Sequence, residues 1–309
     1  MLDKKDISDL RIAFLIQAHA DPDHLRRLVN ALRGHDIFIH WDAKSGPTPE
    51  IPCVTFTNER VSVFWAGFSQ VSATMSMLRA ALKADQKYSK LVLISGSCYP
   101  IKPLAELVRM FAGDGGRNYI NAVRVDESEH LKKLVRKRIW RDAVLPKRLS
   151  RTGIIGAVER WLRAGVNAGI SWVPKQKPYS ELYHGSSWWA LTQDAARHAL
   201  TVYENNPAAR SFYSFTFASD EQFFQTVLRN STFSESCGSA LPYTGRGTYK
   251  TANLHLVDPS LSKWFDIDDL ELIKNSDKFF VRKLRSQQSI QLVDFIDEKI
   301  LKINASRDA

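Results

Sequence analysis

The stretch LVLISGSCYPIKP, residues 91–103, decides the fold. It begins with a short apolar run, Leu91 to Ile94, which is the pattern of a strand buried on both faces. The run ends at Ser95-Gly96-Ser97, and a helical pattern begins at Leu104. A strand that ends abruptly in small hydroxyl residues and leads into a helix is typical of the ligand-binding edge of an open α/β sheet. An ordinary loop explains this stretch equally well, so the rest of the chain has to decide.

Alternating strand and helix patterns extend on both sides of this stretch. Residues 11–18, RIAFLIQA, and 36–41, DIFIHW, predict two buried strands. Asp21 is a candidate N-cap, with Pro22 at the first helical position. Further patterns predict short strands at 54–56, 61–63 and 119–123 and a long helix that begins at Trp65. The alternation over the first 125 residues predicts a mostly parallel sheet.

Composition limits the class of protein. The chain has 309 residues, of which 44% are hydrophobic and 25% charged, enough for one large α/β domain or two smaller ones. No apolar run reaches the roughly 18 residues of a membrane span, and we do not interpret the N-terminus as a signal peptide. Cys53, Cys98 and Cys237 lie too far apart for a disulfide framework or a metal knuckle, which fits a reducing cytoplasm. The net charge of +10 favours an anionic partner: a nucleotide phosphate, a nucleic acid or an acidic membrane surface.

Basic residues dominate the segment 130–165, where only Asp142 and Glu159 oppose them. The cations are Lys132, Lys133, Arg136, Lys137, Arg138, Arg141, Lys147, Arg148, Arg151, Arg160 and Arg163. Apolar residues that include Trp140 and Trp161 are interleaved with them. A basic amphipathic segment with tryptophans suits a membrane surface or an anionic polymer. A solvated helical insertion over the sheet fits the same pattern equally well.

The last third of the chain holds another strand, an acidic helix start and a basic loop. Residues 185–191, GSSWWAL, predict a strand. Ser219 is a candidate N-cap of a helix whose first turn holds Asp220 and Glu221. Acidic residues at that place interact with the helix dipole or carry out chemistry. Residues 278–283, KFFVRK, predict a basic loop between helices near 268–274 and 289–303.

An ordered set of blocks resembles the core-2/I-branching glycosyltransferase family, which also holds the peptide O-xylosyltransferases, and suggests a bacterial-type member. The blocks are HADPDHL at 19–25, IFIHWDAKS at 37–45, VFWAGFSQV at 63–71, LISGSCYPIKP at 93–103, GSSWWAL at 185–191, SDEQFFQTVLRNS at 219–231 and SDKFFVRKL at 276–284. Each block is weak alone, but together they span almost the whole chain except the basic segment.

The resemblance implies a single domain over 1–309 with the α/β, GT-A-type glycosyltransferase fold, a mixed, mostly parallel central sheet flanked by helices. Residues 1–125 would form the nucleotide-sugar-binding half, 126–180 a basic helical insertion, and 181–309 the acceptor and catalytic half. The implied reaction is inverting transfer of a sugar, GlcNAc or xylose, from a UDP-sugar to a hydroxyl of a glycan or glycolipid. We expect no metal and no cofactor beyond the UDP-sugar, because Ser95-Gly96-Ser97 stands where most such enzymes carry Asp-x-Asp, and Mg²⁺ requires carboxylate oxygens.

The resemblance also assigns roles to residues. Glu221 matches the catalytic base, and Lys283 matches the lysine on the diphosphate, with Arg282 as a second candidate contact. The family also carries a basic residue upstream, but no arginine stands at the corresponding place in this sequence. His255 is the nearest candidate, and Arg246 and Lys250 lie in the preceding loop. The nucleotide contacts fall on His19, Asp42, the 65–69 segment beginning at Trp65, and the strand end Ser95, Gly96 and Ser97. On the acceptor side, the matching residues are Trp188, Trp189 and Asp220. From the residues alone, Asp42 holds a ribose hydroxyl or caps a turn.

Two alternatives remain open from the sequence. The first is a non-enzymatic binder of an anionic polymer or membrane, such as RNA or acidic lipid, through residues 130–165. The lack of an RNA-binding signature counts against RNA. The second is a transferase that uses a different nucleotide-sugar. For the enzyme we expect a cytoplasmic location, peripheral at the inner face of the membrane, and a role in surface polysaccharide or lipid-linked glycan synthesis.

Overall fold

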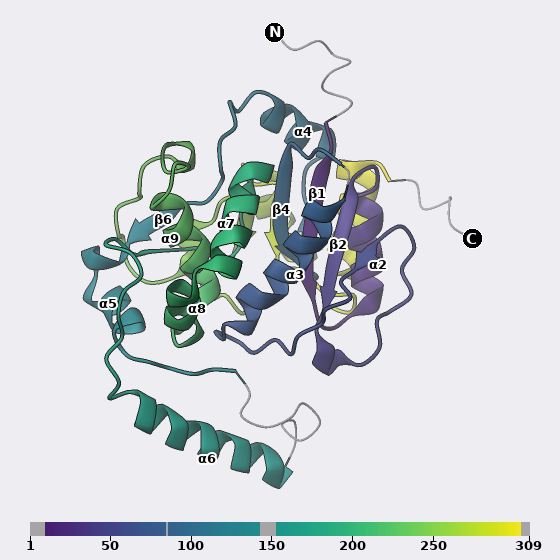
Figure 1. Ribbon diagram of the computed structural model, residues 1–309. Coiled ribbons are helices and arrows are strands. Elements are labelled where there is room, and N and C mark those ends of the chain that lie inside the picture. The colour runs from purple at the N-terminus through teal and green to yellow at the C-terminus, as the bar shows by residue number, and fades with distance from the viewer. Residues whose placement is uncertain (1–9, 85, 143–152, 304–309) are drawn as a thin grey trace.

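The computed structural model describes residues 10–84, 86–142 and 153–303. Within these residues, five strands form the central sheet in the order β3-β2-β1-β4-β8 (Figure 1). The strands β1 (Ile12–Ala18), β2 (Asp36–Trp41), β3 (Thr55–Phe56) and β4 (Lys90–Ser95) are parallel to their neighbours. The edge strand β8 (Ala190–Leu191) runs antiparallel to β4. The predicted α/β class and mostly parallel sheet are therefore confirmed.

Helices cover both faces of this sheet because its strands are apolar on both sides. Leu15 and Leu93 face one core, which is shared with α3, α7, α8 and α9. Phe14 and Ile94 face the other core, which is shared with α2, α4, α10 and α11. These helices are α2 (Pro22–Ala31), α3 (Ser69–Lys83), α4 (Leu104–Ala112), α7 (Gln193–Asn205), α8 (Pro207–Ser214), α9 (Phe223–Arg229), α10 (Leu270–Lys274) and α11 (Ile290–Phe295).

The register of the central strands brings their carboxyl ends to one edge. Ala18 of β1 lies opposite Trp41 of β2, and Gln17 lies opposite Ser95 of β4. The residues that follow these three strands therefore meet at the same edge of the sheet. In an open α/β sheet, this edge is where ligands bind.

Two small sheets extend this edge. One pairs β5 (Cys98–Pro100), β10 (Phe280–Arg282) and β9 (His255–Val257) in the order β5-β10-β9. The other pairs β6 (Ala122–Arg124) with β7 (Tyr183–Gly185). Because Arg282 lies opposite Cys98 in the β5–β10 pair, the end of the chain returns to the turn that follows β4.

Several local predictions differ from the structure. The basic loop at 278–283 contains the strand β10, because Phe280 and Val281 are fully buried. The GSSWWAL strand is divided between β7 and β8. Ser219 does not cap a helix: it lies inside a short 3₁₀ turn, Ser219–Glu221, which follows Ala218 in a left-handed conformation.

Residues 61–63 are extended but form no strand. Their backbone is used differently: the Val61 N–H donates to His40 Nε2 at 3.0 Å. The neighbouring Arg60 guanidinium donates to the carbonyl oxygens of Trp41 and Asp42 at 2.9 and 3.2 Å. Side chains and a backbone hydrogen bond, from the Ala43 N–H to the Val61 carbonyl at 3.1 Å, therefore attach this segment to the end of β2.

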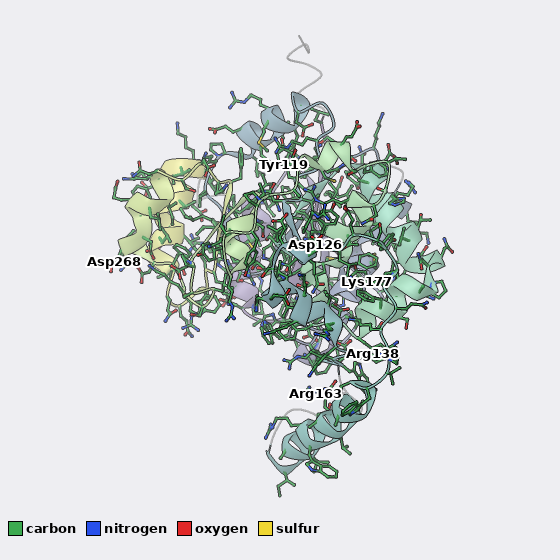
Figure 2. The ribbon with its side chains drawn as sticks, turned by 90° about the vertical axis from the view of Figure 1, so that its left-hand side faces the viewer. Tyr119, Asp126, Arg138, Arg163, Lys177 and Asp268 are labelled. Atoms are coloured by element: carbon green, nitrogen blue, oxygen red, sulfur yellow. The ribbon has the colours of Figure 1, made fainter. Side chains whose placement is uncertain are left out.

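The basic segment contains two helices, α5 (Glu129–Arg136) and α6 (Gly153–Ile170). α6 stands away from the body and does not cover the sheet (Figure 1), and the same is visible from the side where Arg163 is labelled (Figure 2). Lys147, Arg148 and Arg151 lie outside the described residues. No helix in the described part of the chain is long and apolar enough to cross a membrane.

Candidate active site

A cavity of about 500 Å³ opens at the carboxyl ends of β1, β2 and β4. It brings together most of the residues predicted for the nucleotide, from segments more than two hundred positions apart. These are His19, Asp42, Trp65, Ser95, Gly96, Ser97, Arg282 and Lys283, with Trp188 beside them. We call this space the strand-end cavity.

A second cavity of about 370 Å³, which we call the Glu221 cavity, adjoins it. Asp220, Glu221 and His184 line the Glu221 cavity and not the strand-end cavity. Both cavities share Trp65, Gln70, Trp188, Arg282 and Lys283. These shared walls make the two cavities one continuous site, with cations in the middle and a carboxylate at one side.

Arg282 is the central cation of this site. Its Nε donates to Ser95 Oγ at 3.0 Å, and its guanidinium lies 4.7 Å from the centre of the Trp188 ring. Burial lowers the pKa of Arg282, although the nearby carboxylates of Asp220 and Glu221 act in the opposite direction. In the described part of the chain, its terminal amino groups have no hydrogen-bond acceptor and no ion-pair partner. A half-buried cation of this kind, facing two cavities, is suited to an anionic ligand.

Two more cations and an indole extend the positive wall. The ammonium of Lys283 lies 5.9 Å from the centre of the Trp264 ring, and the Arg285 guanidinium lies 4.8 Å from it. Burial, followed by repulsion from Arg282, lowers the pKa of Lys283. Trp264 and Arg285 were not predicted from the sequence. The available signal was the basic run that continues past Lys283 to Arg285.

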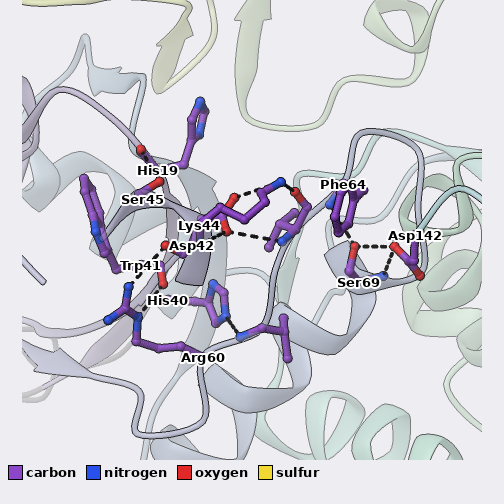
Figure 3. A network of polar contacts seen from close by, with 12 residues as sticks. His19, His40, Trp41, Asp42, Lys44, Ser45, Arg60, Phe64, Ser69 and Asp142 are labelled. Atoms are coloured by element: carbon purple, nitrogen blue, oxygen red, sulfur yellow. Dashed lines mark hydrogen bonds and ion pairs between the residues drawn. The ribbon is translucent and has the colours of Figure 1, made fainter. Parts of the chain in front are cut away.

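Asp42 caps a turn, which is one of the two roles predicted for it. Its carboxylate accepts a hydrogen bond from the Lys44 backbone N–H at 2.8 Å, and Lys44 Nζ lies 3.4 Å from its other oxygen (Figure 3). The Val63 N–H also donates to it, at 3.4 Å. The network around Asp42 continues to His40 and fixes the rim of the strand-end cavity. The ribose contact stays a prediction.

The turn after β4 is tightly packed and carries hydroxyls. Ser95 Oγ lies 3.0 Å from Ser97 Oγ and accepts from Arg282, so this turn orients the central cation. A Cβ added to Gly96 would lie 2.8 Å from the Cβ of Ala18. Glycine at this position is therefore needed for the close approach of β4 and β1. Among residues 10–84, 86–142 and 153–303, no three His, Cys, Asp or Glu side chains gather as a metal site would require.

The two adjacent carboxylates differ in their surroundings. Asp220 is buried, and its Oδ2 accepts from Gln70 Nε2 at 2.9 Å and from Ser187 Oγ at 2.7 Å. Burial, followed by the negative charge of Glu221, raises the pKa of Asp220. The Glu221 side chain is about one-quarter exposed, and its Oε2 lies 3.3 Å from His184 Nε2. Glu221 is thus the carboxylate with access to the cavity, and Asp220 is held in the wall.

The structure places four candidate contacts elsewhere. His255 lines none of the cavities described, and its ring stacks on Phe280 with the centroids 5.3 Å apart. Burial lowers the pKa of His255 to about 3, which favours the neutral ring and disfavours a role as a cation for the diphosphate. Trp189 packs in the core against Phe224 rather than facing the site. Arg246 lines a third cavity of about 230 Å³, together with Lys250.

Sequence reasoning also missed His184. It lies on β7 and faces Glu221, and it lines both the Glu221 cavity and the third cavity. The available signal was its position immediately before the GSSWWAL block. Gln70 was missed as well, although it contacts Asp220 from the first turn of α3 and lies within the VFWAGFSQV block.

Comparison with known proteins identifies the family. A family model described as "Branch: Core-2/I-Branching enzyme" matches residues 12–241, about three-quarters of the chain. The chain belongs to the core-2/I-branching enzyme family. The match includes β1, β4 and the Glu221 turn, whereas Arg282 and Lys283 lie beyond its end. Membership of this family supports the prediction of a glycosyltransferase.

Similar curated proteins agree with this assignment. Xylosyltransferase 2 of Canis lupus familiaris is 25% identical over 313 residues, which cover 93% of this chain and 33% of that protein. Xylosyltransferase 2 of Mus musculus is 25% identical over 316 residues with the same coverage. The xylosyltransferase of Ciona intestinalis is 22% identical over 315 residues, covering 96% of this chain and 35% of that protein. The chain spans about a third of the length of these relatives.

Proposed function

We propose that this chain is an inverting, metal-independent glycosyltransferase of the GT-A type, with Glu221 as its catalytic base. It moves a sugar, GlcNAc or xylose, from a UDP-sugar to a hydroxyl of a glycan or glycolipid acceptor. One observation carries the proposal: Arg282 and Lys283 form the shared wall between a cavity at the strand ends and a cavity that holds Glu221. The family assignment and the xylosyltransferase relatives support the same reaction class.

The arrangement suits a one-step displacement. The UDP-sugar would occupy the strand-end cavity, with its diphosphate against Arg282 and Lys283. The acceptor hydroxyl would enter the Glu221 cavity, where Glu221 takes its proton as the oxygen bonds to the anomeric carbon. The bond from that carbon to the diphosphate oxygen breaks, and UDP leaves with the electron pair. The developing negative charge is stabilised by fixed cations that are already partly desolvated.

The neighbouring residues hold the base in place. Gln70 and Ser187 fix Asp220, and Asp220 belongs to the same 3₁₀ turn as Glu221. His184 contacts Glu221 from β7 at 3.3 Å. Trp188 lies on the cation side of the site, where its ring covers the Arg282 guanidinium and borders the space for the sugar.

The proposal includes partners and location. The donor is a nucleotide-sugar, the acceptor is a glycan or glycolipid, and no nucleic acid is involved. Peripheral contact with an anionic membrane and a cytoplasmic location at its inner face belong to the same proposal. Its support is the net charge of +10 and the basic segment that contains α5 and α6.

A nucleotide screen by thermal unfolding tests the proposal. UDP and UDP-sugars should raise the melting temperature more than ADP does, and a UDP-sugar should release UDP slowly by hydrolysis without an acceptor. Stabilisation by a nucleotide other than UDP would instead select a different donor. A protein that binds a polyanion but is stabilised by no nucleotide would be the non-enzymatic binder, and the transferase proposal would fail.

A further inference from the structure

The helix α6 and the turn after it expose large apolar side chains. Ile154 is 84% exposed, Trp161 is 75% exposed, and Trp172 is 87% exposed. Along α6, which the structure describes in full, only Gly156 and Glu159 are buried. Two exposed tryptophans within twelve residues are unusual, because tryptophan side chains normally bury most of their surface. Exposing this apolar surface to water costs free energy.

Three of the exposed apolar residues lie on one side of α6. Ile154, Val158 and Trp161 follow one another at intervals of four and three residues, so they lie on one helical face. The charged residues of this helix are Glu159, Arg160 and Arg163. The two arginines outnumber the single, buried carboxylate, so the exposed charge is positive.

Further cations stand at the base of the helix. Arg138 donates to the carbonyl oxygen of Pro174, in the segment that follows Trp172, at 3.1 Å. Arg141 lies near Arg163: after burial, repulsion from Arg163 also lowers the pKa of Arg141. An apolar face with tryptophans beside clustered arginines is complementary to an anionic lipid surface, into which apolar side chains insert between negative headgroups. The helix is too short and too polar to span the bilayer, so it would lie in the plane of the interface.

The base of α6 is attached to the rim of the active site. The Trp140 N–H donates to Asn167 Oδ1 of α6 at 2.7 Å, and Asn167 Nδ2 donates back to the Trp140 carbonyl at 3.1 Å. The next residue, Arg141, lies 5.2 Å from the centre of the Trp65 ring, which lines both cavities. Asp142 then accepts a 2.6 Å hydrogen bond from Ser69 Oγ of α3.

We propose that residues 153–173 form an interfacial anchor that binds an anionic bilayer and holds the rim of the active site at its surface. The anchor rests on the peripheral membrane contact of the proposed function and assigns it to named residues, and vesicle binding can be tested without the reaction. Where the reaction is glycosyl transfer, the anchor favours an acceptor that is itself held in the membrane, because such an acceptor is concentrated at the surface where the site opens.

Co-sedimentation with vesicles tests the anchor. The wild-type chain should pellet with phosphatidylcholine vesicles that contain phosphatidylglycerol at low salt, and much less at high salt or with phosphatidylcholine alone. Trp161→Ser with Trp172→Ser should weaken binding by roughly tenfold or more, because inserted aromatic surface supplies the apolar part of the affinity. Arg160→Gln with Arg163→Gln should weaken binding to the anionic vesicles and leave the weak binding to neutral vesicles unchanged.

A matched control tests whether vesicle binding depends on this face of α6 or on any exposed apolar side chain. Leu272 and Ile290 are 52% and 51% exposed on the helices α10 and α11, and Leu272→Ser with Ile290→Ser should bind vesicles like the wild type. All variants should keep the wild-type melting temperature, since the altered side chains are exposed or, at Arg163, half-buried with no role for the charge in the core. Equal binding by the wild type and the double tryptophan variant would overturn the proposal. So would a concentration-dependent dimer, seen by sedimentation velocity, that is lost in the same variant without any pelleting of the wild type.

Discussion

Replacing Arg282 with methionine should separate ligand binding from stability. In the unliganded protein, the half-buried guanidinium is hydrogen-bonded to Ser95 Oγ and lies against the Trp188 ring, and its charge has no ion-pair partner among the described residues. Arg282→Met removes a charge-assisted hydrogen bond and the ring contact, worth about 2–5 kcal/mol together. It also removes the desolvation cost of a half-buried charge, which is about 2–4 kcal/mol. These contributions oppose each other, so the unliganded variant should unfold within about 2 kcal/mol of the wild type.

For UDP binding, in contrast, Arg282→Met has no compensating contribution and should only weaken the affinity. A charge-assisted contact with the diphosphate is worth about 1.5–3 kcal/mol, so its loss should raise the Kd for UDP by about 10- to 150-fold. At a UDP concentration of about 100 times the wild-type Kd, binding stabilises the wild type by about 2.7 kcal/mol. A variant with a Kd about 100-fold weaker gains only about 0.4 kcal/mol at the same concentration.

Denaturant unfolding with and without UDP measures both quantities, and titration calorimetry gives the Kd directly. Arg109→Met is the matched control, because Arg109 is exposed on α4 and lines none of the cavities described. Its UDP-dependent stabilisation should equal that of the wild type. An Arg282→Met protein that keeps the full stabilisation by UDP would refute the assignment of this half-buried cation to the diphosphate.

Three further predictions follow from the site and its surroundings. Lys283→Ala should weaken UDP binding and turnover together, because part of its contact with the diphosphate exists before the reaction; wild-type values of both in steady-state and binding assays would contradict this. UDP release should survive EDTA, since the strand end carries Ser95-Gly96-Ser97 in place of carboxylates; loss of activity that Mn²⁺ restores would reveal a metal site. Burial, followed by repulsion from Arg138, lowers the pKa of Lys175 to about 7. Between pH 7 and its ordinary value of 10.5, the unfolded chain binds a proton that the folded chain does not, so this group adds stability as the pH rises. In denaturant unfolding, the free energy of unfolding of the wild type should therefore rise relative to that of Lys175→Met between pH 7 and 9. A difference between the two proteins that is constant with pH would contradict the assignment.

The sequence predicted the parts of the fold that depend on neighbouring residues. The strands β1, β2 and β4 are short apolar runs, and α2 begins where Asp21 accepts from the His24 N–H and Pro22 follows. Such signals are local, so periodicity and capping residues are sufficient to find them. The strand-end residues then meet because parallel strands bring their carboxyl ends to one edge.

The remaining parts depend on contacts distant in sequence. The pairing of β10 with β9 places His255 beside Phe280 in the interior, which no local pattern reveals. The contact between His184 and Glu221 likewise depends on where β7 lies relative to the 3₁₀ turn. A choice between the adjacent carboxylates Asp220 and Glu221 required the resemblance at first, and the burial of Asp220 now supports it on independent grounds.

The partly exposed carboxylate of Glu221 carries the proposed mechanism, and Glu221→Gln tests it most directly. The substitution keeps the shape of the side chain and removes the oxygen that would accept the proton. UDP should bind to the variant as it does to the wild type, because Glu221 lies outside the strand-end cavity. Transfer to an acceptor, measured as UDP release under single-turnover conditions, should fall by roughly 10²–10⁴-fold. A well-folded Glu221→Gln enzyme that binds UDP and transfers sugar at a near-normal rate would contradict the proposed mechanism.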